Sequence, residues 1–548
     1  MKKILLITLA ILLVTGTVLS SCTQSAPAPT TTPQASTQPI QTTTPRPTTA
    51  TTPRPTTTTT PTVSSQYGGI LKIIISPGLT SIGNPAVNNL PGDGTLARPA
   101  VEALIGWDEA GTETPVPQLA TGWQISPDYK SLKLTLRQGV KFHDGTDFNA
   151  QTAKYCLDIS RKIRTELKSV TSVDILDDYT IRLNLAVYEP TLLGLLTGWP
   201  TCMLSPTALK SMGEESKFHP VGTGPFKFVK YQRDTLLKYE KFDSYWQKDK
   251  PYLDGIEFAF VLDPVTQVVS FKAGEADAIM RVTPNDAISL KAMDKYNFYT
   301  YYSAVYGLAG DSAHSNSVFT DIRVRRAIAY AIDNASVATL GKGYYQATNQ
   351  LRVPGSYGFN PDVKGYPYNP LKSRQLLAEA GYPSGFETKL LFESTTKDLF
   401  TTIQGYLAEV GIKVTLDLAD SARFRESCSK GWYNQLVSFD IPCSVGMDPG
   451  RALASRLANE SVRYDPKSLG RTTDFDTLLA QSNTEFDPDK RLSMLKRLQK
   501  MIIDDYCLVM PIYAPGSVRV DSKRVHDFTP NTYGGPQDWQ PAKVWLSK

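Results

Sequence analysis

Hydrophobic positions along this chain follow two different spacings, one typical of strands and one of helices. In the segment SLKLTLRQGVKF, leucines at 132, 134 and 136 recur at every second position, which predicts a half-buried strand. Asn149 is a favourable helix cap, and small or apolar residues follow it at helical spacing. These residues are Ala153, Cys156, Leu157 and Ser160. The stretch therefore predicts a strand that is followed by a helix.

The same alternation continues toward the C-terminus. Helical spacing recurs within VRRAIAYAID, in 400–409, and after Asp487, whose segment carries apolar residues at 492, 495, 498 and 502. A further helix is bounded by Asn369 as cap, Pro370 at its first position and Gly381 as its stop. Alternating residues at 412–418 and the segment LVMPIY predict strands. Strands that alternate with helices predict an α/β architecture.

The N-terminus has the pattern of a bacterial lipoprotein signal peptide. Lys2 and Lys3 precede an apolar run over 4–19, which is short for a membrane span. LSSC follows, so we expect a signal peptide over 1–21 and lipidation of Cys22. Two or more acyl chains on one cysteine make a stable anchor. The predicted location is extracytoplasmic, on the outer face of the cell membrane; an ordinary secretory peptide with a chance cysteine is the alternative.

Residues 22–66 have the composition of a disordered tether. Of the forty-four positions after Cys22, nine are proline and eighteen are threonine. Such a segment has too little apolar surface to offset the entropy of folding. Proline favours extended polyproline II at about 3.1 Å per residue, so the tether can reach on the order of 100 Å.

Composition argues for a soluble globular protein that does not bind nucleic acid. The chain is 41% hydrophobic and 20% charged. Its formal charge of +5 is small, and its basic residues form no cluster. Five cysteines remain besides Cys22, at irregular spacing, so a disulfide framework is not implied. Cys428 and Cys443 are the pair with the best claim to a bridge, and buried free thiols are the preferred alternative.

Sequence motifs for catalysis are missing. The chain has no GxSxG, Walker A, HExxH or CxxC pattern, and its four histidines are scattered. We therefore predict no catalytic residues, no metal site and no cofactor. His143, beside the Asp144-Gly145 turn, is expected to bond to nearby backbone. A surface hydrolase that uses a pair of carboxylates stays open as an alternative, because Asp and Glu are plentiful.

The segment PVPQLATGWQISPDYKSLKLTLRQGVKFHDGTDFNAQTAKYCL closely resembles the signature region of the family 5 extracellular solute-binding proteins of ABC transporters. Further motifs follow in the family's order: VGTGPFKFVKY, YWQKDKPYLDGIEFAFVLDP, FKAGEADAI and FTDIRVRRAIAYAID. The resemblance covers nearly all of residues 67–548. Residues that stand where the signature requires them are Trp123, Leu136, Arg137, Phe142, His143, Asp144, Gly145 and Ala153.

This resemblance implies a two-lobed periplasmic-binding-protein-like α/β fold of type II, with a hinge between the lobes and an extra small domain. Mapped by motif order, lobe one holds 67–82, 221–305 and 508–548, the inserted small domain 83–220, and lobe two 306–507. The implied function is a monomeric, non-enzymatic receptor that captures a peptide or similar small solute and delivers it to ABC transporter permease subunits. A receptor that senses a ligand for a signalling partner is the other alternative.

The resemblance also implies where the ligand binds. In peptide-binding relatives a strand of lobe two pairs with the ligand backbone, and an aspartate beyond it meets the ligand's ammonium group. The corresponding segment is WYNQLVSFDIPCSVGMDPGRAL, where Val445 departs from the family's D-x-x-D-P pattern. The candidate ligand-binding residues are Trp432 and Phe439 as pocket walls, Asp440 or Asp448 toward a cation, and Tyr306 and Tyr513 near the crossover segments. A helix cap at Asp448 and a core position for Trp432 are the alternatives.

Overall fold

The computed structural model describes residues 66–83, 91–108, 114–198, 201–393, 396–443, 448–461, 463–528 and 539–548. These residues belong to one folded unit, Val63–Lys548. The predicted signal peptide, Cys22 and the tether up to residue 65 lie outside the described residues. Among the described residues, no helix combines the length and the apolar character needed to cross a membrane.

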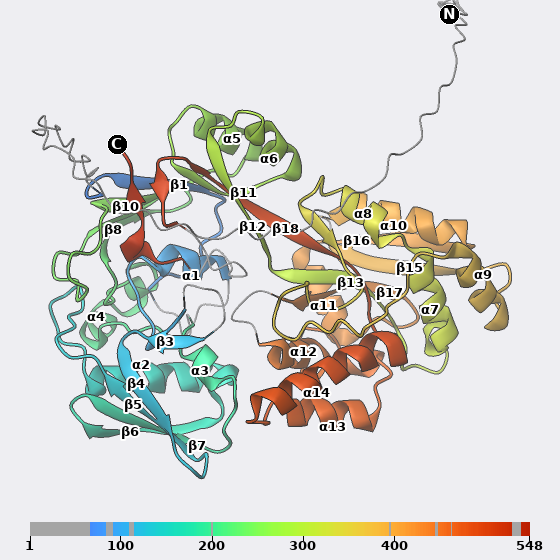
Figure 1. Ribbon diagram of the computed structural model, residues 1–548, viewed down its shortest axis with the longest axis horizontal. Coiled ribbons are helices and arrows are strands. Elements are labelled where there is room, and N and C mark those ends of the chain that lie inside the picture. Colours follow the sequence, from blue (N-terminus) through green and yellow to red (C-terminus); the bar gives the residue numbers. More distant parts are fainter. Residues whose placement is uncertain are drawn as a thin grey trace, which may run out of the picture. The chain divides into compact units, whose positions relative to one another are not determined.

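Twelve strands join in one mixed sheet, whose neighbours are mostly distant in sequence (Figure 1). Its path runs through β16 (Ile412–Ala419), β15 (Phe386–Glu393), β17 (Leu436–Pro442), β13 (Ala304–Gly310), β18 (Met510–Ser522), β11 (Ala278–Val282), β1 (Ile70–Ile75), β10 (Gly255–Phe260), β9 (Leu236–Lys241) and β8 (Phe226–Gln232). β12 (Tyr296–Tyr302) and β14 (Tyr345–Ala347) also pair with β18.

β18 connects two groups of elements. The first group lies around strands β1 and β8 to β12, and the second group lies around strands β13 to β17. Its C-terminal half pairs antiparallel with β12 and β11, and its N-terminal half pairs with β13 and β14. Because β13 follows β12 after a single residue, two antiparallel chain segments run together between the groups (Figure 1). The first part of β18 packs in the core of the second group, through Met510, Ile512 and Tyr513. The division into lobes drawn from the sequence stays a prediction.

A separate four-stranded antiparallel sheet forms from residues 120–185. Its order is β4 (Ala120–Ile125), β5 (Ser131–Leu136), β7 (Thr180–Leu185) and β6 (Val170–Asp177). Helix α2 (Ala150–Ile163) packs against this sheet. A reciprocal capping box between Asn149 and Thr152 forms the N-terminus of this helix. The strand over 131–136, the Asn149 cap and the apolar face of the following helix are confirmed.

The remaining helices divide between the two groups of elements. In the first group they are α1 (Pro91–Ala97), α3 (Leu192–Leu195), α4 (Pro206–Met212), α5 (Pro264–Lys272) and α6 (Pro284–Lys291), with the short ribbon β2 (Ile105–Trp107) and β3 (Pro115–Pro117) and the pair β19 (Val525–His526) and β20 (Trp545–Leu546). In the second group they are α7 (Ile322–Ala331), α8 (Asn334–Thr339), α9 (Pro370–Glu379), α10 (Lys397–Glu409), α11 (Ser421–Lys430), α12 (Pro449–Leu457), α13 (Thr473–Ser482) and α14 (Pro488–Lys500).

The caps predicted for α9 and α14 are confirmed, since Asn369 and Asp487 accept hydrogen bonds from their first turns. The helix predicted over 400–409 begins three residues earlier, at Lys397. The helical pattern after Asp487 continues into a π-helix, Met501–Asp505, that the sequence did not indicate.

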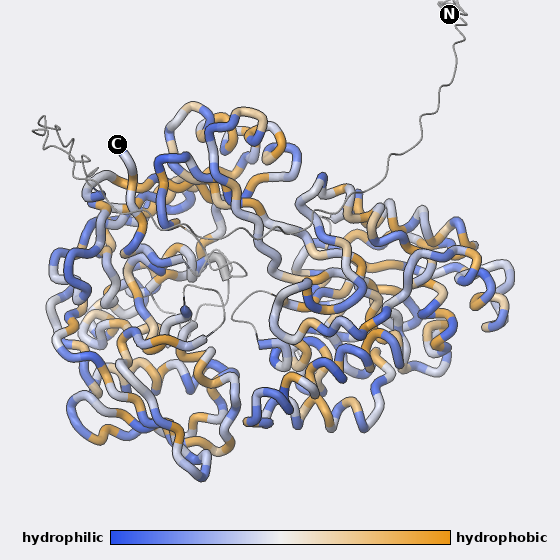
Figure 2. The backbone as a smooth tube through the Cα atoms, viewed as in Figure 1, coloured by the Kyte–Doolittle hydropathy of each residue, from blue (hydrophilic) through white to orange (hydrophobic). Residues whose placement is uncertain are grey.

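Hydrophobic residues line the strands and the inner faces of the helices (Figure 2). One core cluster extends from β1 through the four-stranded sheet to β20, so the elements of predicted lobe one and of the small domain share it. In the second group the two larger clusters form, one with α7, α9 and α10 and one with α11 to α14. All five cysteines of the folded part are buried free thiols. This agrees with the alternative that their irregular spacing favoured over a bridge between Cys428 and Cys443.

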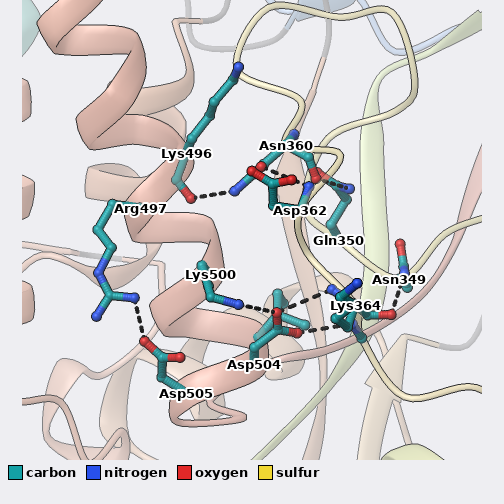
Figure 3. A network of polar contacts seen from close by, with 12 residues as sticks. Asn349, Gln350, Asn360, Asp362, Lys364, Lys496, Arg497, Lys500, Asp504 and Asp505 are labelled. Carbon is teal, nitrogen blue, oxygen red and sulfur yellow. Dashed lines mark hydrogen bonds and ion pairs between the residues drawn. The ribbon is translucent and has the colours of Figure 1, made fainter.

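The irregular segment 348–368 is held by polar contacts with α14 and the π-helix (Figure 3). Asp504 accepts backbone hydrogen bonds from Lys364 at 3.1 Å and Gly365 at 2.9 Å. The Asn360 side chain donates to the carbonyl of Lys496 at 2.9 Å. A long loop therefore gains a fixed path without regular secondary structure.

Candidate functional site

Three of the predicted ligand-binding residues meet on neighbouring strands. Tyr306 of β13 stands opposite Tyr513 of β18 on one side and Asp440 of β17 on the other. The rings of Tyr306 and Tyr513 stack with their centroids 5.7 Å apart, and Tyr345 of β14 lies 5.4 Å from Tyr513. Burial, together with the negative charge of Asp440, raises the pKa of Tyr306 to about 12. The phenol is therefore a neutral hydrogen-bonding group at physiological pH.

Asp440 lies at the centre of a buried charge cluster. Its carboxylate accepts hydrogen bonds from Arg456 at 2.7 Å, Arg463 at 3.2 Å and the hydroxyl of Tyr464 at 2.8 Å. Burial alone would raise the pKa of Asp440, but the two arginines hold it below its ordinary value. One carboxylate faces two guanidinium groups, so the three side chains together carry a net positive charge.

Asp448 caps helix α12. Its carboxylate accepts a hydrogen bond from the backbone N–H of Arg451 at 3.0 Å. It also pairs with Arg491 through two contacts of 2.6 and 2.7 Å. The structure thus gives Asp448 the capping role named as the alternative, and a ligand contact at this residue stays a prediction.

Trp432 and Phe439 pack inside the second group. Both side chains are fully buried, in the cluster that α11 to α14 form with the sheet. Phe439 stacks on Tyr464 with centroids 4.1 Å apart, and Trp432 meets the same ring edge-on at 5.9 Å. Trp432 therefore has the core position named as its alternative. These two rings support the strand that carries Asp440, and their part in a pocket wall stays a prediction.

The structure adds residues that the sequence did not single out. Arg456, Arg463 and Tyr464 complete the cluster around Asp440, and Tyr345 completes the tyrosine group. The partners of Asp440 follow it by 16 to 24 positions, a separation without any local periodicity. No sequence signal marks them, because α12 and the segment after it fold back on β17.

A cavity of about 470 Å³ lies elsewhere, beside α1 and the β2–β3 ribbon. Glu102 is buried at its edge. Its carboxylate accepts hydrogen bonds from Tyr245 at 2.8 Å, Trp246 at 2.9 Å and Thr223 at 2.9 Å. Burial raises the pKa of Glu102, and these donors act against the rise. The sequence did not indicate this cavity.

Catalytic chemistry finds no support at His143. Its Nε2 lies 2.9 Å from the carbonyl oxygen of Gly224, which confirms the expected backbone contact. Burial lowers the pKa of His143 to about 4, so the ring is neutral at physiological pH. Among the described residues, His, Cys, Asp and Glu side chains form no group able to hold a metal ion.

Comparison with known proteins places this fold among solute-binding proteins. Residues 114–441 match the bacterial extracellular solute-binding proteins, family 5 (middle). The glutathione-binding protein GsiB of Pectobacterium atrosepticum is 31% identical over 338 residues, which are 60% of this chain and 65% of that protein. The matched region thus spans just under two thirds of that relative's length.

Two solved structures share the fold. The ABC transporter-associated periplasmic binding protein DppA from Helicobacter pylori, in complex with the peptide STSA, gives a TM-score of 0.72 at 23% identity, over 88% of this chain and 99% of that one. The periplasmic binding protein AgaA from A. tumefaciens R10, in complex with agropinic acid, gives 0.71 at 25% identity, over 88% and 99%. The predicted two-lobed α/β fold is confirmed. Since the family match covers more than half of the chain, this chain belongs to the bacterial extracellular solute-binding proteins of family 5.

Proposed function

We propose that this chain is a lipid-anchored extracytoplasmic receptor that captures a peptide or similar small solute and passes it intact to an ABC importer. The observation that carries the proposal is the junction of β13, β17 and β18, which brings Tyr306, Tyr513 and Asp440 together where the chain passes between two groups of elements. Family membership supports the same conclusion. The protein works as a monomer without a cofactor and makes or breaks no covalent bond in the solute.

The mechanism follows from the two groups and their connection. Two rigid bodies joined by paired strands close on a solute that contacts both, and the closed state gains the contacts of each body at once. Lobe one (67–82, 221–305 and 508–548), the small domain (83–220) and lobe two (306–507) are the proposed bodies. The importer distinguishes the closed form from the open one.

The solute class is proposed from charge and from the relatives. Val445 stands where the family pattern has an aspartate, and Asp440 is already neutralised by Arg456 and Arg463. A site with net positive charge favours solutes that carry carboxylates. The names of the relatives mention glutathione, the peptide STSA and agropinic acid, and each of these solutes carries a carboxylate.

Membrane attachment is proposed through Cys22, which follows the lipobox sequence LSSC. A Cys22→Ala variant should leave the membrane fraction and appear in the soluble extracytoplasmic fraction, because an unlipidated chain has no anchor. Cell fractionation with detection of the chain tests this, and a variant that stays membrane-bound contradicts it. Cys202→Ala, a change at a buried thiol, is the matched control.

Native mass spectrometry of the purified protein tests the receptor proposal. Glutathione, the peptide STSA and agropinic acid are each added to the protein, and both the bound mass and the free solute are measured. A receptor binds at least one of them, returns it unchanged, and gains about 2.7 kcal/mol of stability at a solute concentration 100-fold above Kd. Hydrolysis products in place of the intact solute contradict the proposal and support the carboxylate-pair hydrolase.

A further inference from the structure

The cavity of about 470 Å³ beside α1 is walled by aromatic side chains from distant segments. Tyr245, Trp246 and Trp539 line it, and the polar atom of each is already used. Tyr245 and Trp246 donate to Glu102, at 2.8 and 2.9 Å, and Trp539 donates to the carbonyl of Thr95 at 3.3 Å. What these rings offer to the cavity is therefore apolar surface.

The ring of Trp246 is held in place from a second side. The guanidinium of Arg137 lies over it, 4.2 Å from its centroid. With its N–H bound to Glu102 and one face covered by Arg137, this indole has little freedom to swing into the cavity. The apolar wall is thus built before any ligand arrives.

Four charged residues line the cavity, and three of them have partners. Glu102 accepts the hydrogen bonds described above, Asp108 accepts one from the backbone of Thr114 at 3.1 Å, and Lys543 also has a partner. Arg98, half-buried just after α1, is different. Within the described ranges no residue forms a hydrogen bond or ion pair with its guanidinium.

The half-buried guanidinium of Arg98 presents its N–H donors in a planar fork, and none of its nitrogens is among the fully buried unpaired atoms, so they can reach a ligand in the cavity. A carboxylate matches that fork with two parallel hydrogen bonds. A phosphate would bring a further negative charge into a cavity that already has the Glu102 carboxylate at its edge. A carboxylate joined to an apolar body fits both the fork and the aromatic wall.

We propose that this cavity binds a small carboxylic acid with an apolar body, the carboxylate on Arg98 and the body against Tyr245, Trp246 and Trp539. The site is distinct from the residues around Asp440 and does not depend on the importer role. The acid has two sources, a separate small molecule or the carboxylate end of a peptide solute, and the experiment separates them.

Titration of the full-length protein with 3-phenylpropionate and its neutral amide, 3-phenylpropionamide, tests the proposal through tryptophan fluorescence and calorimetry. Wild type should bind the acid at least about 10-fold more tightly than the amide. Arg98→Gln should reduce binding of the acid to the level of the amide and leave the amide unchanged. Arg98→Lys keeps the charge but loses the planar fork of donors. Its affinity for the acid should lie between those of wild type and Arg98→Gln.

Arg233→Gln is the matched control, because Arg233 is 89% exposed and does not line the cavity. It should keep the wild-type preference for the acid. Thermal unfolding of each variant verifies that it is folded. Equal binding of acid and amide to wild type, the same preference in Arg98→Gln, or no binding of the acid up to about 10 mM would each overturn the proposal.

Competition identifies the source of the acid. The dipeptide Met-Leu is added with a free or an amidated C-terminus while bound 3-phenylpropionate is followed. Displacement by the free dipeptide alone assigns the cavity to the carboxylate end of a peptide. Unchanged binding of 3-phenylpropionate assigns it to a separate small acid.

Discussion

His143 illustrates how burial sets the charge of a single residue. Its Nε2 contacts the carbonyl of Gly224, its ring meets Phe242 edge-on with centroids 4.9 Å apart, and its backbone N–H donates to Gly222 at 2.9 Å. Burial is the main cause of its low pKa, and it outweighs the hydrogen bond to Gly224. The residue binds the loop at 222–224 to the Asp144-Gly145 turn.

This low pKa predicts a pH dependence of stability. In the unfolded chain His143 takes up a proton near pH 6.5, but the folded protein resists protonation until about pH 4. The contribution of the neutral His143 to the free energy of unfolding is therefore fully present above pH 6.5. It falls by up to about 3 kcal/mol as the pH drops toward 4. Urea unfolding of wild type and His143→Gln between pH 4 and 7.5 measures this.

The His143→Gln variant should show a much smaller fall over that range. His526→Gln, which removes a histidine that stacks on Trp545 near the C-terminus, should keep the wild-type fall. Parallel pH profiles for wild type and His143→Gln would contradict a buried neutral histidine.

Asp440 gives a second prediction with a different pH window. Asp440→Asn removes the charge that faces Arg456 and Arg463, which leaves two partly buried guanidinium groups without an anion. We expect a loss of about 3–5 kcal/mol at pH 7 in urea unfolding. Because the folded pKa is lowered, this stabilisation is present above the unfolded pKa of about 4 and is lost as the pH falls through the folded value.

The difference between wild type and Asp440→Asn should therefore shrink as the pH falls below about 4. Asp417→Asn is the matched control, because Asp417 forms a partly exposed pair with Arg423 at 2.6 Å and should lose at most about 1 kcal/mol. Equal losses in the two variants would contradict the buried cluster.

At the scale of elements, local signals in the sequence predicted more than contacts between elements. The alternating leucines of β5 and the caps Asn149, Asn369 and Asp487 act within a few residues, so each was correctly placed from the sequence. The Asp440 cluster and the unpaired Arg98 depend on segments that meet only in the folded chain. The π-helix Met501–Asp505 likewise contacts the distant segment 348–368, through Asp504, and its own periodicity did not indicate it.

The π-helix supports a prediction about this loop attachment. Asp504→Ala should destabilise the protein by about 1–3 kcal/mol, because the backbone N–H groups of Lys364 and Gly365 lose their acceptor (Figure 3). Hydrogen exchange should speed up at 364 and 365 while the strands of the sheet keep their protection. Asp505→Ala, at a neighbour that pairs with half-exposed Arg497, should change exchange there very little.

On the scale of the whole molecule, β18 is the element that explains the fold. The segment LVMPIY predicted only the start of this strand, whereas β18 continues to Ser522 and pairs with four different strands, β11, β12, β13 and β14. The two-lobed architecture came from the order of family motifs, since periodicity alone gave only the α/β class. Neither the family motifs nor the periodicity predicts which solute binds, because binding depends on side chains brought together from several elements.

Small-angle X-ray scattering of the purified protein, with and without the solute that native mass spectrometry identifies, tests whether two bodies close on an intact molecule. The radius of gyration should decrease when the solute is added, and the solute should be recovered unchanged afterwards. Identical scattering profiles in the presence and absence of a solute that the protein steadily converts into products would contradict both expectations.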